Sequence, residues 1–316
     1  MRYLTYPALL ASTLAASAAF AGQITVYSAH GDEIYGPLVA SFEEAHPDID
    51  VQVIVGETSA LFQRVQAESA NPAADVQWGG AVQSYQEFAD LYQAYESPEA
   101  ASLRIRDPNN KWFPFSLFAQ PLLVNTKLVA EADYPKSVRD VLDSRFDAAG
   151  GVVLADPNHS GTGYSIVSGL AAGLGWDFMT EVIRKVRATP GSTPMFEAVR
   201  DGEAALGWIN EDLGAKWQAE GLPVKMIYPP DGVTVQVDGL AIINGAPNPA
   251  DAQTFVDYII SQQGQTVSTS VVNRRSVRSD VEPPQGLPAL DDLTLLTAEE
   301  PADVIKAKFT AILEGK

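Results

Sequence analysis

Hydrophobic and polar positions follow two periods along the first part of the chain, and the two periods alternate three times. Strand-like apolar runs cover residues 23–27, 49–55 and 75–78. Each run is followed by a short loop, with Gly79-Gly80 as a turn after the third, and then by apolar residues at helical spacing. Strand–loop–helix units repeated in this way predict an α/β layer with parallel strands.

The most informative stretch runs from residue 152 to residue 175. Val152 to Ala155 form a buried strand, Asp156-Pro157-Asn158 ends it, and Ser160-Gly161-Thr162-Gly163 opens a helix. The first amides of that helix have no intrahelical partner, and together with the helix dipole they attract negative charge. We therefore expect this loop to form one wall of a small-molecule binding cleft, with the amides of residues 161–164 as a phosphate or phosphonate cradle.

The remaining pattern predicts two lobes joined by two crossings. A strand at 121–125 enters the second lobe and a strand at 233–243 returns from it, and about 295 residues are too many for one compact core. The fold class expected is α/β, with two hinged lobes and a cleft between them. The expected boundaries are 22–118 plus 246–285 for lobe one, 119–245 for lobe two, and 286–316 for a C-terminal tail helix.

Residues 1–21 have the features of a signal peptide. Arg2 is followed by an apolar stretch of small residues, and Ala19-Phe20-Ala21 suits signal-peptidase cleavage. The chain has no cysteine, which excludes thiol catalysis, thiolate metal sites and a lipoprotein anchor. We expect an exported protein of the periplasm.

Charge and motifs limit the possible functions further. The formal net charge is −19, which argues against nucleic acid as a partner but leaves a local anion site possible. The sequence holds no Gly-x-Ser-x-Gly, Walker loop, His-Glu-x-x-His or Gly-x-Gly-x-x-Gly after a strand. We expect no enzymatic activity, no cofactor and no metal.

Four loops that follow strands and precede helices carry small polar residues, and in open α/β sheets such loops surround the ligand. The candidate ligand-binding residues come from these loops and from carboxylates near the strand ends of lobe two: Ser28, His30, Thr58, Ser59, Trp78, Gly79, Gly80, Ser160, Gly161, Thr162, Asn210, Glu211 and Asp238.

Each candidate has a structural alternative. Ser160, Thr58 and Ser59 could simply cap helices, and Trp78 could belong to the core. His30 could be a solvated loop residue, and the carboxylates could cap surface helices. Arg274 and Arg275 could bind phosphate, although surface salt bridges explain adjacent arginines more often.

The chain resembles the periplasmic substrate-binding proteins of ABC importers, in the class that includes ferric-ion-binding proteins and binders of phosphorylated sugars and aminoethylphosphonate. The matching segments are 24–28, 74–80, 156–164 and 238–243. The iron binders hold the metal with tyrosines, often an adjacent pair, usually helped by an acid and a histidine. Here Asn210-Glu211 stands at the tyrosine-pair position and Gly80 at the acid position, so the resemblance to the sugar-phosphate and phosphonate binders fits better.

The resemblance implies a two-lobed periplasmic-binding-protein (type II) fold with a hinged interlobe cleft. It also implies a monomer that closes on one organic phosphate or phosphonate and delivers it to an ABC permease in the inner membrane. Glu211 and Asp238 would select the hydroxyl or amine end of the ligand. Two alternatives stay open: a component of an importer for ferric iron or another metal, and an exported hydrolase.

Overall fold

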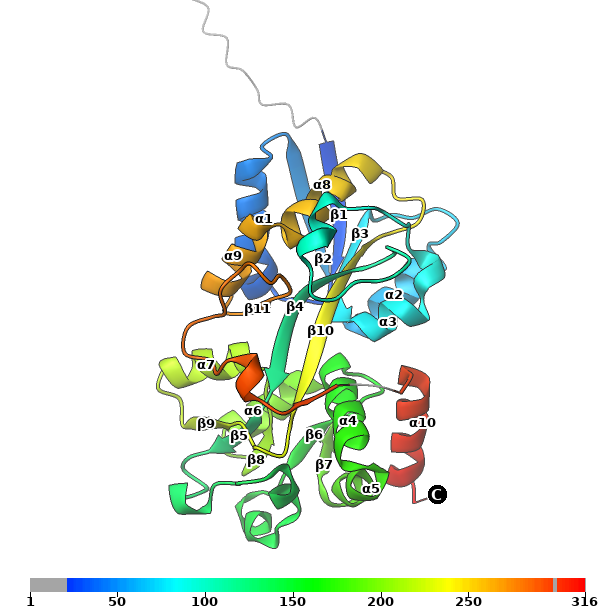
Figure 1. Cartoon of the computed structure of the whole chain (residues 1–316). Helices are drawn as coiled ribbons and strands as arrows, with labels where there is room; N and C mark the ends of the chain where they lie inside the picture. Colours follow the sequence, from blue (N-terminus) through cyan, green and yellow to red (C-terminus); the bar gives the residue numbers. More distant parts are fainter. Residues whose placement is uncertain (1–21, 298–299, 316) are drawn as a thin grey trace, which may run out of the picture.

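A computed structural model describes residues 22–297 and 300–315, and the expected signal peptide lies outside them (Figure 1). Its largest sheet has the order β11-β4-β10-β3-β1-β2, with β12 paired to β10. The parallel pairs β1–β2 and β1–β3 confirm the repeated strand–loop–helix units, whereas β10 runs antiparallel to β3 and β4. The strands of this sheet are β1 Gly22–Ser28, β2 Ile49–Val55, β3 Val76–Ala81, β4 Phe113–Gln120, β10 Val233–Ile242, β11 Arg275–Ser276 and β12 Leu295–Leu296.

Helices cover both faces of the upper part of this sheet. Alternate side chains of β1 point to opposite faces, and the apolar side chains on each face pack against helices. Ile24 and Val26 share one apolar cluster with α1 and α8, while Tyr27 belongs to a second cluster with α2 and α3. Buried on both sides, the sheet forms the core of lobe one. Its helices are α1 Asp32–Ala45, α2 Thr58–Ala67, α3 Val82–Glu87, α8 Pro249–Ile260 and α9 Gln262–Ser270.

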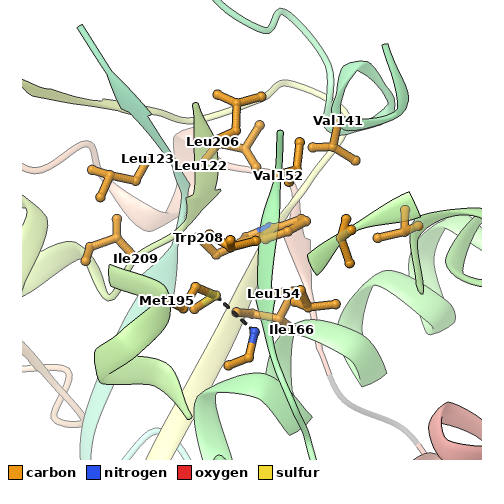
Figure 2. Close-up of a cluster of buried hydrophobic side chains, with 14 of the residues drawn as sticks. Leu122, Leu123, Val141, Val152, Leu154, Ile166, Met195, Leu206, Trp208 and Ile209 are labelled. Atoms are coloured by element: carbon orange, nitrogen blue, oxygen red, sulfur yellow. Dashed lines mark hydrogen bonds between the residues drawn. The ribbon is translucent and has the colours of Figure 1, made fainter. Parts of the chain in front are cut away.

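The second lobe is built on two small sheets. Its core surrounds Trp208, with Leu154, Ile166 and Met195 close by (Figure 2). One sheet has the order β8-β5-β9 and the other pairs β6 with β7. Its elements are β5 Leu122–Asn125, β6 Val153–Ala155, β7 Arg187–Thr189, β8 Leu206–Trp208, β9 Val224–Ile227, α4 Gly161–Leu174, α5 Trp176–Lys185, α6 Ser192–Arg200, α7 Glu211–Ala219 and α10 Ala302–Leu313.

Short 3-10 helices fill several connections. They span Ala89–Leu91, Pro98–Ser102, Glu131–Asp133, Val138–Leu142, Ser144–Ala149 and Leu290–Asp292. The sequence Ser137-Val-Arg-Asp140 predicts a capping box, and this box is present at the head of one of them. Across residues 22–297 and 300–315, none of the helices combines the length and the apolar character that crossing a membrane requires.

Two long strands, β4 and β10, run between the lobes (Figure 1). The end of β10 pairs with β3, and its beginning pairs with β12 and with the end of β4. Both ladders of β10 shift register next to Asp238, which marks a bulge, and a bulge re-aims the side chains around it. This arrangement confirms the two-lobed α/β fold, although the expected lobe boundaries stay a prediction.

Two expectations about the region after residue 78 were wrong. Gly79 and Gly80 do not form a turn but belong to strand β3, with φ of +99° and +89°. A Cβ at Gly80 would lie 2.6 Å from the Thr58 side chain, so the strand passes close to the head of α2. The helical spacing after residue 81 predicts a helix from Val82 to Ala94, but the helix ends at Glu87.

The C-terminal segment packs against lobe two. Helix α10 lies beside α4 and α5 (Figure 1), and the Tyr164 hydroxyl donates to the Glu300 carbonyl at 3.0 Å. Strand β12 places the Leu296 side chain against Gly173 and Gly232, where an added Cβ would clash with it, and the Leu296 carbonyl against Gly169, where a Cβ would lie 2.8 Å away. Glycines thus form a slot that Leu296 fills.

We expect Leu296→Ala to empty this slot and lower the free energy of unfolding by about 2–4 kcal/mol, the cost of a buried leucine that leaves a cavity. Leu295→Ala is the matched control, because Leu295 is 37% exposed and should cost less than about 1 kcal/mol. Urea denaturation of both variants measures the difference. Equal losses would show that the glycine slot contributes nothing.

Candidate functional site

A cavity of about 1100 Å³ lies between the lobes. Lobe one contributes the loops after β1 and β2 and Gly80, and lobe two contributes the heads of α4, α6 and α7. Gln236 and Asp238 of β10 line it from the crossing between the lobes, together with Phe118 and Arg274. Each lobe therefore supplies part of the lining.

Ser160 caps the first turn of α4, but the cap leaves some of the amides at the head of this helix without a partner. The Ser160 hydroxyl accepts from the Gly163 amide at 3.0 Å, and its carbonyl accepts from the Tyr164 amide at 2.9 Å. The amides of Gly161 and Thr162 make no hydrogen bond within the described part of the chain. The cradle is thus two amides wide and not four as expected.

The heads of α2 and α6 also face this cavity uncapped, and unlike the uncapped heads of α1 and α7 they carry no acidic residue in the first turn. Neither α2, which begins at Thr58, nor α6, which begins at Ser192, has a side chain that caps its first amides. Thr58 and Ser59 on one side and Ser192 and Thr193 on the other line the cavity. The positive ends of three helix dipoles, those of α2, α4 and α6, therefore point into the same cavity.

Arg274 forms the floor of the cavity and is only 4% exposed. Its Nε lies 2.9 Å from Asp212 Oδ2, and its Nη1 lies 2.7 Å from Asp238 Oδ2. Nη1 also donates to Ser116 Oγ at 3.2 Å, and the guanidinium lies 4.3 Å from the Phe118 ring centroid. Burial raises the pKa of Asp238, and Arg274 counteracts that shift. The expected surface salt bridge was wrong, because this ion-pair network is buried.

His30 is buried beside this network, which rules out the solvated-loop interpretation. Its side chain is 5% exposed and packs edge-on against Trp78 at 5.6 Å. Nε2 lies 3.8 Å from Asp238 Oδ2. Burial lowers the pKa of His30 well below 6.5, and the nearby Arg274 lowers it further. The imidazole is therefore neutral at pH 7.

Four of the candidate residues lie outside the lining of the cavity. Ser28 is fully buried and its hydroxyl accepts from the His30 amide at 3.1 Å. Trp78 is fully buried in the core of lobe one, as its structural alternative predicts, and Gly79 lies beneath His30. Glu211 is 1% exposed, so it cannot select a ligand group as expected.

Glu211 instead ties α7 to the crossing between the lobes. Its Oε1 accepts from the Arg275 Nε and from the Ala119 amide, both at 2.7 Å. Its Oε2 accepts from Arg275 Nη2 at 2.9 Å and from the Tyr228 hydroxyl at 3.1 Å. Every oxygen of this carboxylate is occupied, so its role is structural.

The structure brings the other nine candidates together around the cavity: His30, Thr58, Ser59, Gly80, Ser160, Gly161, Thr162, Asn210 and Asp238. Sequence reasoning did not select Asp212, Arg274, Gln236, Ser192 or Thr193, which also line it. The Gly191-Ser-Thr-Pro194 sequence before a helical pattern was a usable signal for the head of α6. Nothing local in the sequence distinguishes Arg274 from Arg275.

The known proteins that this chain resembles share one fold but bind different ligands. The family of bacterial extracellular solute-binding proteins matches residues 27–266. An uncharacterized protein of Haemophilus influenzae is 30% identical, over 83% of this chain and 80% of its own. A putative 2-aminoethylphosphonate-binding periplasmic protein of Salmonella paratyphi A is 26% identical, over 82% of this chain and 80% of its own.

Solved structures agree with the fold. The periplasmic binding protein AfuA of Actinobacillus pleuropneumoniae, with fructose-6-phosphate bound, has a TM-score of 0.80 at 22% identity, covering 93% of this chain and 97% of that one. Iron-bound HitA of Pseudomonas aeruginosa has a TM-score of 0.79 at 20% identity, covering 92% and 99%. At these identities the likeness shows the fold alone.

We expect Arg275→Met to lower the free energy of unfolding by about 3–5 kcal/mol, because it leaves the buried Glu211 carboxylate without a counter-charge. The double variant Arg275→Met with Glu211→Gln removes the unpaired charge and should recover more than half of the loss. Urea denaturation measures both. A double variant as unstable as the single one would contradict the ion-pair explanation.

The neutral state of His30 predicts a pH dependence of stability. Below about pH 6.5 the unfolded chain binds a proton that the folded chain refuses, so acidification favours unfolding. We expect the free energy of unfolding of the wild type to fall, relative to His30→Leu, by up to about 1.4 kcal/mol per pH unit as the pH drops below 6.5. Urea denaturation from about pH 8 to pH 5 tests this, with the exposed His159→Leu as the control that should follow the wild type. Parallel curves for wild type and His30→Leu would contradict it.

Proposed function

This chain belongs to the bacterial extracellular solute-binding proteins, and we propose that its ligand is an organic phosphate or phosphonate. Members of the family act as binding components of ABC importers and deliver their ligand to a permease. The relatives with assigned ligands include both phosphorylated or phosphonate compounds and iron. The choice among ligand classes therefore rests on the lining of the cavity.

The convergence of the heads of α2, α4 and α6 on one cavity is the observation that favours an anion. Backbone amides that have no partner in the protein bind phosphate oxygens without any basic side chain. The hydroxyls of Ser59, Thr162 and Ser192 stand beside these amides and can add hydrogen bonds. The net charge of −19 does not oppose this, because local dipoles act at short range.

Ferric iron fits the lining less well. A hard trivalent ion needs several anionic oxygens, and within the described residues no tyrosine lines the cavity. The two buried carboxylates at its floor, Asp212 and Asp238, are already paired with the guanidinium of Arg274. With one guanidinium against two carboxylates, the floor retains at most one negative charge, which is too little to balance a trivalent cation.

The position of the heads also suggests how binding closes the protein. Ligand contacts from α2 come from lobe one, and those from α4 and α6 come from lobe two. Only a closed state lets the anion contact both sets, so the ligand stabilises closure by its differential affinity for that state. In this proposal the protein works as a monomer in the periplasm, serves a permease in the inner membrane and performs no catalysis.

We expect Gly161→Pro to weaken phosphate or phosphonate binding by roughly tenfold or more, since it removes one amide that donates to a charged group, worth about 1.5–3 kcal/mol. Proline suits this first helical position, and the extended Ser160 before it (ψ 122°) accommodates the ring. A Cβ at Gly161 meets only the Gln236 amide nitrogen, at 4.0 Å. Titration calorimetry with a sugar phosphate and an alkylphosphonate measures the change.

Gln262→Pro is the matched control. Gln262 is the first residue of α9, outside the cavity, and the Ser261 before it is also extended. This variant should bind as the wild type does. Unchanged affinity in Gly161→Pro would contradict the amide cradle, and tight binding of ferric salt with no organic anion bound would replace the proposal by the iron alternative.

A further inference from the structure

A side cavity of about 110 Å³ adjoins the main cavity at the head of α4. The two cavities share Thr58, Ser59 and residues 159–161 as lining. Lobe one supplies one wall of the side cavity from α2 and α3, and lobe two supplies the opposite wall from α4 and α10 (Figure 1). Because its walls belong to different lobes, a hinge movement between the lobes changes the width of the side cavity.

The two walls of the side cavity carry opposite charges. Glu87, the last residue of α3, lines it from lobe one, and Lys306 of α10 lines it from lobe two. Glu87 is exposed and Lys306 is half-buried, so water reaches both. Within the described part of the chain, they are the one carboxylate and the one lysine or arginine that line this cavity.

Both charges lack a partner in this arrangement of the lobes. Neither the Glu87 carboxylate nor the Lys306 ammonium makes a hydrogen bond or an ion pair within residues 22–297 and 300–315. Lys308, further along α10, pairs instead with Glu300 at 2.6 Å inside the C-terminal segment. The lysine of α10 that faces lobe one is therefore the one left free to pair across the side cavity.

The charge of Glu87 already acts on the opposite wall. Tyr164 of α4 lines the side cavity from lobe two. Burial raises the pKa of its hydroxyl, and the carboxylate of Glu87 raises it further. An ammonium group on the same wall experiences this field as an attraction, and the attraction grows as the distance between the charges decreases.

We propose that Glu87 and Lys306 form an ion pair across the side cavity when the lobes close, and that this pair favours the closed state before any ligand binds. In the open state both charges are solvated and attract each other weakly. A larger closed population in turn raises the apparent affinity for the ligand. The inference goes beyond the proposed function, because the ion pair acts without a ligand and does not depend on the identity of the ligand.

Interlobe distances in the ligand-free protein test this ion pair. The chain has no cysteine, so Gln66→Cys and Glu181→Cys place one spin label on α2 and one on α5, both at exposed residues. Double electron–electron resonance then measures the closed and open populations. We expect Glu87→Gln and Lys306→Gln each to lower the ratio of closed to open molecules about two- to fivefold. The variant with both substitutions should be no more open than either single one, because the same pair is lost.

Three further measurements separate an ion pair from a merely structural role. The charge-reversed variant, Glu87→Lys with Lys306→Glu, should recover the wild-type ratio. Added salt should lower the ratio of the wild type but not that of the double glutamine variant, because screening weakens an exposed pair. Lys308→Gln is the matched control and should keep the wild-type ratio, since it removes the same charge from the same helix but breaks an ion pair within the C-terminal segment. A wild type without closed molecules, or single variants with the wild-type ratio, would overturn the proposal.

These outcomes are independent of the ligand. Loss of the ion-pair effect with phosphate or phosphonate binding intact would leave the proposed function in place. A working ion pair in a protein that binds no organic anion would overturn the proposed function alone.

Discussion

Two adjacent arginines hold the crossing between the lobes, and the geometry of the cleft depends on them. Arg274 joins Asp212 of α7, Asp238 of β10 and Ser116 of β4. Arg275 turns the other way and binds Glu211, the residue before Asp212. Two neighbouring ion pairs thus attach the head of α7 to both long strands. Because both ion pairs are buried, removing one partner leaves the other charge uncompensated. The ion pairs therefore specify this arrangement of α7 and the long strands even if their net contribution to stability is small.

The contrast between Glu211 and Asp212 shows where sequence reasoning succeeds and where it stops. The repeated strand–loop–helix pattern was enough to predict the parallel strands, the two lobes and the loops that line the cleft. It could place the 210–212 segment at the cleft but not decide which carboxylate faces it, because that depends on the rotation of α7 after Asn210. Arg274 and Arg275 come from a segment with no strong periodicity, and only tertiary contacts assign them opposite directions.

In the proposed anion site, backbone groups take the part that lysine and arginine take in many such sites. At the heads of α2, α4 and α6 the donors are amides whose positions are fixed by the helices themselves. Such donors need little reorganisation when the ligand arrives, and the dipoles add to each other. Among the described residues, Arg274 is the arginine that lines the cleft, and its guanidinium is committed to two carboxylates. The floor therefore differs chemically from the walls. This division gives a ligand a defined orientation.

The return of strand β12 and helix α10 to lobe two has a consequence for the order of assembly. Leu296, Ile305 and Phe309 belong to the same apolar cluster as Trp208 and Leu154. A chain that emerges in order from a ribosome or a translocation channel delivers these residues after the rest of lobe two. The core of lobe two stays incomplete until they arrive, whereas the strands and helices of lobe one up to β11 are already available. The half of the protein that begins at β5 is thus completed by a segment that is synthesised after the elements of lobe one.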